Sequence, residues 1–124
     1  MTKETLRDDL IIELPFPPSS LNPNGRNHWA ALAKAKRIYR AECQMLAVGA
    51  RNKTGFKSPE RPNVTVIFHP PDKRRRDEDN MIAAFKAGRD GVADAISVDD
   101  YHWKTGYEFA EPVKGGKVIV RIKA

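Results

Sequence analysis

The pattern of apolar and polar positions along the chain predicts four β-strands. Apolar side chains occupy every second position in residues 64–68 and again in residues 118–122, which is the period of a strand packed on one face. Residues 10–16 form a further apolar segment that ends at a pair of prolines, and residues 101–109 have the composition of a strand. We therefore expect a sheet assembled from segments spread over the whole chain.

Two other segments repeat their apolar positions every three to four residues, as amphipathic helices do. The first covers residues 28–50. The second is predicted to begin at Asp79 or Asn80, either of which can cap a helix N-terminus, and to reach about Ile96. Each helix has one apolar face that can pack on the sheet.

The element order β-α-β-α-β-β predicts an α+β fold, a small mixed sheet packed against two helices. Residues 111–116 end in Gly115-Gly116, which predicts a hairpin between the last two strands. A length of 124 residues suits one domain over residues 1–124. Residues 1–9 are polar and mixed in charge, so we expect them to be flexible.

Composition points to a soluble protein of the cytoplasm with an anionic partner. The 22 Lys and Arg residues exceed the 16 Asp and Glu residues, for a net charge of +6, which favours nucleic acid or an anionic membrane face; a merely soluble basic protein is the alternative. The single cysteine, Cys43, cannot form an internal disulfide, as is usual in a reducing compartment. The N-terminus is unlike a signal peptide, and no apolar run approaches the roughly 20 residues that span a bilayer.

Acidic residues directly after a basic run are the most informative feature of the chain. The run Lys73, Arg74, Arg75 and Arg76 leads into a segment with Asp77 and Asp79. In an extended chain two residues so spaced point the same way, and a strand-to-helix junction allows oxygen ligands to converge on a hard cation such as Mg²⁺. The alternative is that the aspartates only cap a helix.

Two further features of the sequence can extend this site. Asp99 or Asp100, after the second helix, can return a third carboxylate to the same point. On a helical wheel Asp79, Lys86 and Asp90 share one exposed face, although an ordinary solvated face and a surface lysine would give the same pattern.

Carboxylates beside a basic patch suit phosphodiester cleavage. The cations position the DNA backbone, metal-bound carboxylates activate water, and a lysine offsets charge on the phosphate or the leaving oxygen. The histidines are scattered and no Cys or His pair has zinc-ligand spacing, so a zinc site is not indicated. A glycine-rich phosphate loop is also missing from the sequence.

These motifs resemble the RusA family of Holliday-junction resolvases, which is common in bacteria and their prophages. The segment Arg-Arg-Arg-Asp77-Glu-Asp79-Asn80, followed by Asp99-Asp100, carries the resemblance. The opening Leu-Pro-Phe-Pro-Pro-Ser and the closing Lys-Gly-Gly segments support it. The resemblance covers about residues 10–122.

The resemblance implies a homodimeric, Mg²⁺-dependent endonuclease, with Mn²⁺ as a second usable ion, that resolves four-way DNA junctions by paired symmetric nicks. It assigns the catalytic role to Asp77, Asp79 and, from the Asp-Asp pair, Asp100, and it places Arg76 in contact with DNA. Which of Asp99 and Asp100 is the main metal ligand stays open. The family's usual lysine position is Ala83 here, so we expect Lys86, one turn further along, to replace it. Two alternatives are a DNA-binding module without catalysis and a less selective nuclease for branched or single-stranded DNA.

Overall fold

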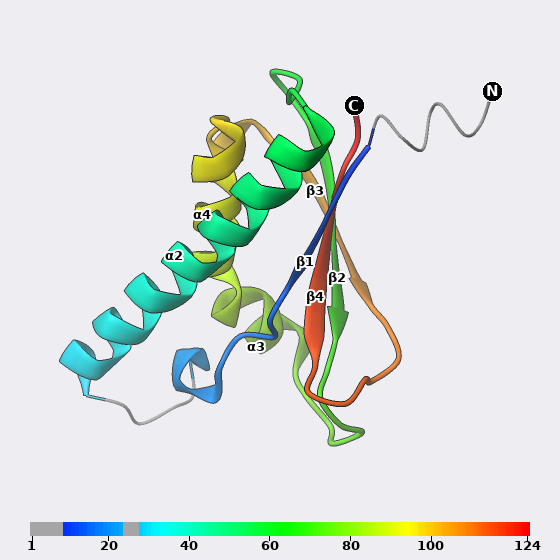
Figure 1. Ribbon diagram of the computed structural model, residues 1–124. Helices are drawn as coiled ribbons and strands as arrows, with labels where there is room; N and C mark the ends of the chain where they lie inside the picture. The colour runs from blue at the N-terminus through cyan, green and yellow to red at the C-terminus, as the bar shows by residue number, and fades with distance from the viewer. Residues whose placement is uncertain (1–8, 24–27) are drawn as a thin grey trace.

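The computed structural model describes residues 9–23 and 28–124, which form four strands, three α-helices and two short 3-10 helices (Figure 1). In chain order these elements are β1 (Leu10–Leu14), η1 (Ser19–Leu21), α2 (Trp29–Thr54), β2 (Asn63–His69), α3 (Glu78–Ala84), α4 (Lys86–Ile96), η2 (Asp100–His102), β3 (Lys104–Phe109) and β4 (Lys117–Ile122). The expected mixed α/β architecture with a four-stranded mixed sheet is confirmed. None of the helices in the described part of the chain has the length and apolar character needed to cross a membrane.

The strands form one sheet in the order β1-β4-β2-β3. β4 runs antiparallel to both β1 and β2, whereas β2 and β3 are parallel. In register, Val120 of β4 lies between Ile12 and Val66, and all three side chains are at most 1% exposed. The alternating apolar positions of the sequence therefore form the sheet face of the core.

The predicted hairpin between the last two strands is wrong. Gly115 and Gly116 do make a turn, with φ of 81° and 70°, but the chain then returns between β1 and β2 instead of pairing with β3. β4 pairs with β1 on one side and with β2 on the other, and every second side chain of β4 is fully buried. β3 lies at the edge of the sheet beside β2, and none of its residues is fully buried.

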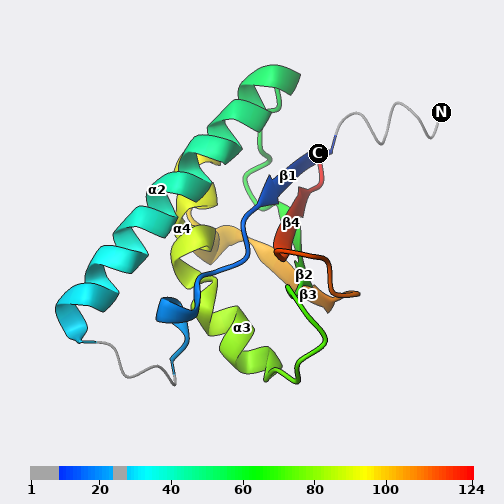
Figure 2. The same cartoon turned by 60° about the horizontal axis from the view of Figure 1, so that its bottom comes forward.

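Figures 1 and 2 show α2 and α4 side by side on one face of the sheet. α2 buries Tyr39, Cys43 and Ala47 and leaves most of its other residues exposed. It continues to Thr54, four residues beyond the predicted end, and stops where Gly55 adopts a left-handed φ of 70°.

The predicted second helix is divided into α3 and α4 at Phe85, and the chain changes direction there (Figure 2). The Phe85 side chain is 1% exposed and packs edge-on against Tyr39 and Phe68, so the break places its ring in the core. The N-cap is Asp77, not Asp79 or Asn80 as predicted. A helical wheel drawn across this region is therefore not valid beyond Phe85.

Two boundaries also differ from the prediction. The strand expected over residues 101–109 begins at Lys104, because η2 takes the residues before it. Of the nine N-terminal residues expected to be flexible, 1–8 lie outside the described residues, but Asp9 is 9% exposed and its carboxylate lies 2.9 Å from Arg121. Burial tends to raise the pKa of Asp9, but the hydrogen bonds from Arg121 and from the backbone N–H of Ala124, together with the charges of Arg121 and Lys123, lower it overall.

Candidate functional site

The first turn of α3 carries two of the predicted catalytic aspartates. The Oδ1 atom of Asp77 accepts a hydrogen bond of 2.8 Å from the backbone N–H of Asp79, so Asp77 caps the helix. The Asp79 side chain is exposed, and its carboxylate has no hydrogen bond or ion pair with any described residue. Asp77 is thus already used in capping, whereas Asp79 is available to a ligand.

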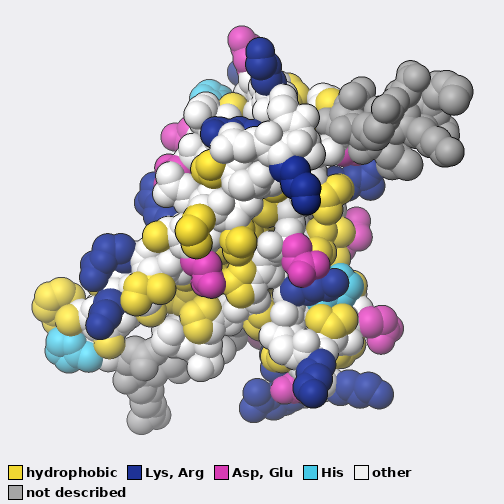
Figure 3. Space-filling model, in the orientation of Figure 1, with side chains coloured by type: hydrophobic (Ala, Val, Ile, Leu, Met, Phe, Trp, Pro, Cys, Tyr) yellow, Lys and Arg dark blue, Asp and Glu magenta, His cyan; other side chains and the backbone are white. Residues whose placement is uncertain are grey.

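The basic run lies on the connection from β2 to α3, and Figure 3 shows Lys and Arg side chains gathered at that end of the molecule. Lys73, Arg74 and Arg75 are exposed. Arg76 is different: its Nη1 atom donates to Asp72 at 2.9 Å and its guanidinium lies 5.9 Å from the centroid of the Phe16 ring. Arg76 therefore holds the loop in place through these contacts. Lys73, Arg74 and Arg75 form the accessible cationic surface of the loop.

A hollow of about 480 Å³ brings part of this basic run next to the acidic turn. Arg74, Arg75 and Arg76 line it together with Asp77 and Phe16. The proximity of cations and carboxylate that the sequence indicated is therefore present at the start of α3.

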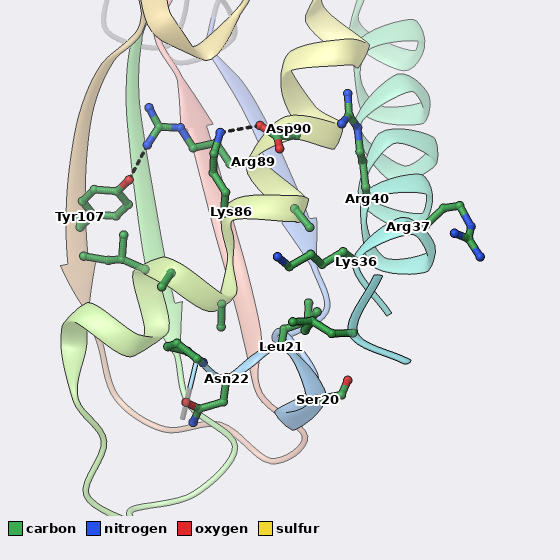
Figure 4. A pocket seen from close by; sticks show the side chains of 16 residues that line it. Ser20, Leu21, Asn22, Lys36, Arg37, Arg40, Lys86, Arg89, Asp90 and Tyr107 are labelled. Carbon is green, nitrogen blue, oxygen red and sulfur yellow. Dashed lines mark hydrogen bonds and ion pairs between the residues drawn. The ribbon is translucent and has the colours of Figure 1, made fainter. Parts of the chain in front are cut away.

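Lys86 and Asp100, which are 14 residues apart in the chain, are in direct contact. The Lys86 Nζ atom lies 3.0 Å from Asp100 Oδ2 and 2.7 Å from Asp90 Oδ1, and Figure 4 shows the second of these contacts. The hydrogen bond to Asp90, and then that to Asp100, outweigh burial and raise the pKa of Lys86. The amine is held in its protonated form between two carboxylates.

Arg89 is a second cation at Asp100. Its Nε atom lies 3.0 Å from Asp100 Oδ2, although without the alignment of a hydrogen bond, and its Nη1 atom donates to the Tyr107 hydroxyl at 2.6 Å (Figure 4). Its guanidinium also lies 5.3 Å from the centroid of the Trp103 ring. Burial tends to raise the pKa of Asp100, but the Lys86 hydrogen bond and the charges of Lys86 and Arg89 lower it overall. Asp100 is therefore an ionised carboxylate neutralised by two cations.

Asp99 has a different role from Asp100. Its Oδ1 atom accepts a 3.0 Å hydrogen bond from the backbone N–H of Tyr101, so it caps η2. Asp99, Asp100 and Asp90 line a hollow of about 450 Å³ between α4 and η2. This hollow does not include Asp77 or Asp79.

The predicted ligand set is not assembled as a metal site. Within residues 9–23 and 28–124, no three or more His, Cys, Asp or Glu side chains are placed so that they could hold a metal ion. Asp77 and Asp79 lie at the N-terminus of α3, whereas Asp99 and Asp100 lie at the N-terminus of η2, and Asp100 is paired with Lys86 and Arg89. The four carboxylates do not fit a preformed Mg²⁺ site in this conformation of the single chain.

Asp72, Asp90 and Arg89 form ion pairs around the site and were not assigned a functional role from the sequence. Asp72 and Arg76, as well as Lys86 and Asp90, are spaced four apart, so both ion pairs had a detectable signal in the sequence. The contact between Arg89 and Asp100 had none, because it depends on how η2 folds back onto α4.

Comparison with known proteins gives a relative without an assigned function. No model of a known protein family matches the chain. A protein of Xylella fastidiosa, described as an uncharacterized protein, is 34% identical over 114 residues, which cover 90% of this chain and 74% of that protein.

Proposed function

We propose that this chain, which belongs to the same family as the Xylella fastidiosa protein, is a structure-selective endonuclease that resolves four-way DNA junctions in the manner of the RusA resolvases. It would act in DNA recombination and repair as a crossover junction endodeoxyribonuclease. The proposal rests on the sequence resemblance and on one structural observation, which is the contact between Lys86 and Asp100.

That contact supports the proposal because it joins two members of the predicted catalytic set. The residue expected to replace the family lysine and the third predicted acid lie 3.0 Å apart, although they come from different elements. A protonated Lys86 amine is suited to offset negative charge on a phosphate or on a leaving oxygen. At 60% side-chain exposure it is also accessible to a DNA strand.

The surface around α3 supports DNA as the substrate. Lys73, Arg74 and Arg75 are exposed next to the acidic first turn of α3. Cations of this kind bind phosphates and fix the register of a protein on DNA without reading its sequence. Arg76 would position this loop rather than bind DNA in the observed conformation.

Mg²⁺, or Mn²⁺ in its place, belongs to the proposal as an implication of the resemblance. Because the carboxylates do not form a ligand set in the described chain, we assign no catalytic step to the ion. The residues themselves would bind the backbone through the basic run, and Lys86 would neutralise phosphate charge where a bound phosphate takes the place of its carboxylate partners Asp90 and Asp100. A homodimer is part of the proposal because paired nicks require two sites related by symmetry.

The test is cleavage of a synthetic four-way junction by the purified chain with Mg²⁺, with Mn²⁺, and with a chelator alone. We expect two symmetric nicks near the crossover that depend on the ion, while a linear duplex of the same sequence remains uncut. Failure to nick the junction with either ion would refute the proposal.

A DNA-binding module without catalysis is the second candidate, and the lack of a carboxylate cluster among the described residues favours it. It predicts junction binding that weakens steeply with salt and no nicking under any condition. A less selective nuclease would instead cut single-stranded and branched DNA at similar rates.

A further inference from the structure

We infer that the groove between α2 and the α3–α4 segment receives one unpaired nucleotide of a DNA strand, with its phosphate on Lys36 and its base on an apolar floor. This inference rests on the proposed function and names the part of the substrate that the site would hold.

The groove is a distinct feature of the described chain. It has a volume of about 780 Å³, within the range of sites that bind small organic groups. η1, α2, α3 and α4 form its walls (Figure 4). Leu32 of α2 and Ile82 of α3, both half-buried, contribute to an apolar floor together with Ala84 and Ala87.

The charge of the groove favours an anion. Most of its cations are already neutralised: Arg40 lies 2.9 Å from Asp94, and Lys86 and Arg89 are engaged by Asp100. Lys36 and Arg37, by contrast, have no acidic partner among the described residues.

Lys36 and Arg37 differ in direction. Figure 4 shows the amine of Lys36 extending from α2 toward α3 and α4, whereas the guanidinium of Arg37 points away from the groove. Lys36 is therefore the unpaired cation positioned over the apolar floor.

A nucleotide fits this combination better than duplex DNA does. The phosphate supplies the anion for Lys36, and an unpaired base can bury its face on Leu32 and Ile82 independently of sequence. Bases within a duplex are stacked and cannot reach such a floor. Because Lys86 also lines the groove, a nucleotide bound there would lie next to the proposed catalytic lysine.

The experiment measures binding of labelled single-stranded oligothymidylate and of an abasic oligonucleotide of equal length, by fluorescence anisotropy at low salt. We expect K36Q to weaken oligothymidylate binding about tenfold. K34Q is the matched control, because Lys34 is exposed on the same helix but does not line the groove, and it should change affinity less than about twofold.

The wild type should also bind oligothymidylate about tenfold more tightly than the abasic strand, and L32Q, checked for folding by circular dichroism, should abolish this preference. Equal effects of K36Q and K34Q, or equal affinity for the two strands, would overturn the inference. If the wild type nevertheless cuts junctions, the proposal that the groove binds a nucleotide is refuted and the nuclease assignment stands. If the binding results hold but no junction is cut, the nuclease assignment alone fails.

Discussion

Replacing Asp79 with asparagine is expected to lower the rate of four-way junction cleavage at least about 100-fold, with little loss of junction binding. The Asp79 carboxylate is exposed and has no partner among the described residues, so the change removes a charge without disturbing the packing of the chain. Single-turnover cleavage of a labelled junction, with binding measured separately, gives both quantities.

Glu78→Gln is the matched control for this prediction. Glu78 is also an exposed acid of the first turn of α3, but it lies outside the predicted catalytic set. Its replacement should leave the rate within about twofold, because a helix-terminal charge of this kind contributes little on an exposed surface. Equal losses in the two variants would indicate a general effect of charge, and an unchanged rate in D79N would contradict a catalytic role for Asp79.

The largest effect on stability is expected from Gly91→Ala, which should lower the free energy of unfolding by about 3 kcal/mol. At Gly91 the backbones of α4 and α2 approach so closely that an added Cβ would lie 2.4 Å from the carbonyl oxygen of Arg40 and 3.0 Å from the backbone nitrogen of Gln44. Backbone atoms cannot move aside as a flexible side chain can, so the two helices would have to separate. Urea unfolding followed by circular dichroism measures the change.

Gly49→Ala is the matched control for Gly91→Ala. It tests whether the loss of stability comes from the close contact between α4 and α2 or from replacing any glycine within a helix. Gly49 lies within α2, and an added Cβ would meet nothing within 4 Å. The substitution should stabilise the protein by about 0.5–1 kcal/mol through helix propensity. If G91A were as stable as G49A, the close approach of α2 and α4 would not be as described.

The parts of the fold that could be predicted from the sequence are those that depend on local burial. The alternation in residues 64–68 and 118–122 identified two strands because every second side chain in each enters the core. The α2 helix was recognisable because Tyr39 and Cys43 face the core one helical turn apart.

The parts that could not be predicted depend on contacts between distant segments. Gly115-Gly116 makes a turn in either topology, so the placement of β4 between β1 and β2 had no local signal. The break at Phe85 follows from the contacts of its ring with Tyr39 and Phe68, which come from other elements.

The candidate site shows the same division. The motif residues were visible in the sequence, and the expected closeness of Lys86 to an acid of the set is present at Asp100. The gathering of Asp100 with Asp77 and Asp79 is not present in the described chain. Lys36 was not noticed, since its importance depends on the groove that α2 forms with α3 and α4.

Whether Lys86 and Asp100, which lie 3.0 Å apart, act together on the same phosphate is decided most directly by the cleavage rate of the double variant K86Q/D100N beside the two single variants. Residues that operate as one catalytic unit have non-additive effects, so we predict that the double variant is no slower than the slower single variant. Losses that multiply in the double variant, or a D100N enzyme that cuts junctions at the wild-type rate, would contradict a shared site.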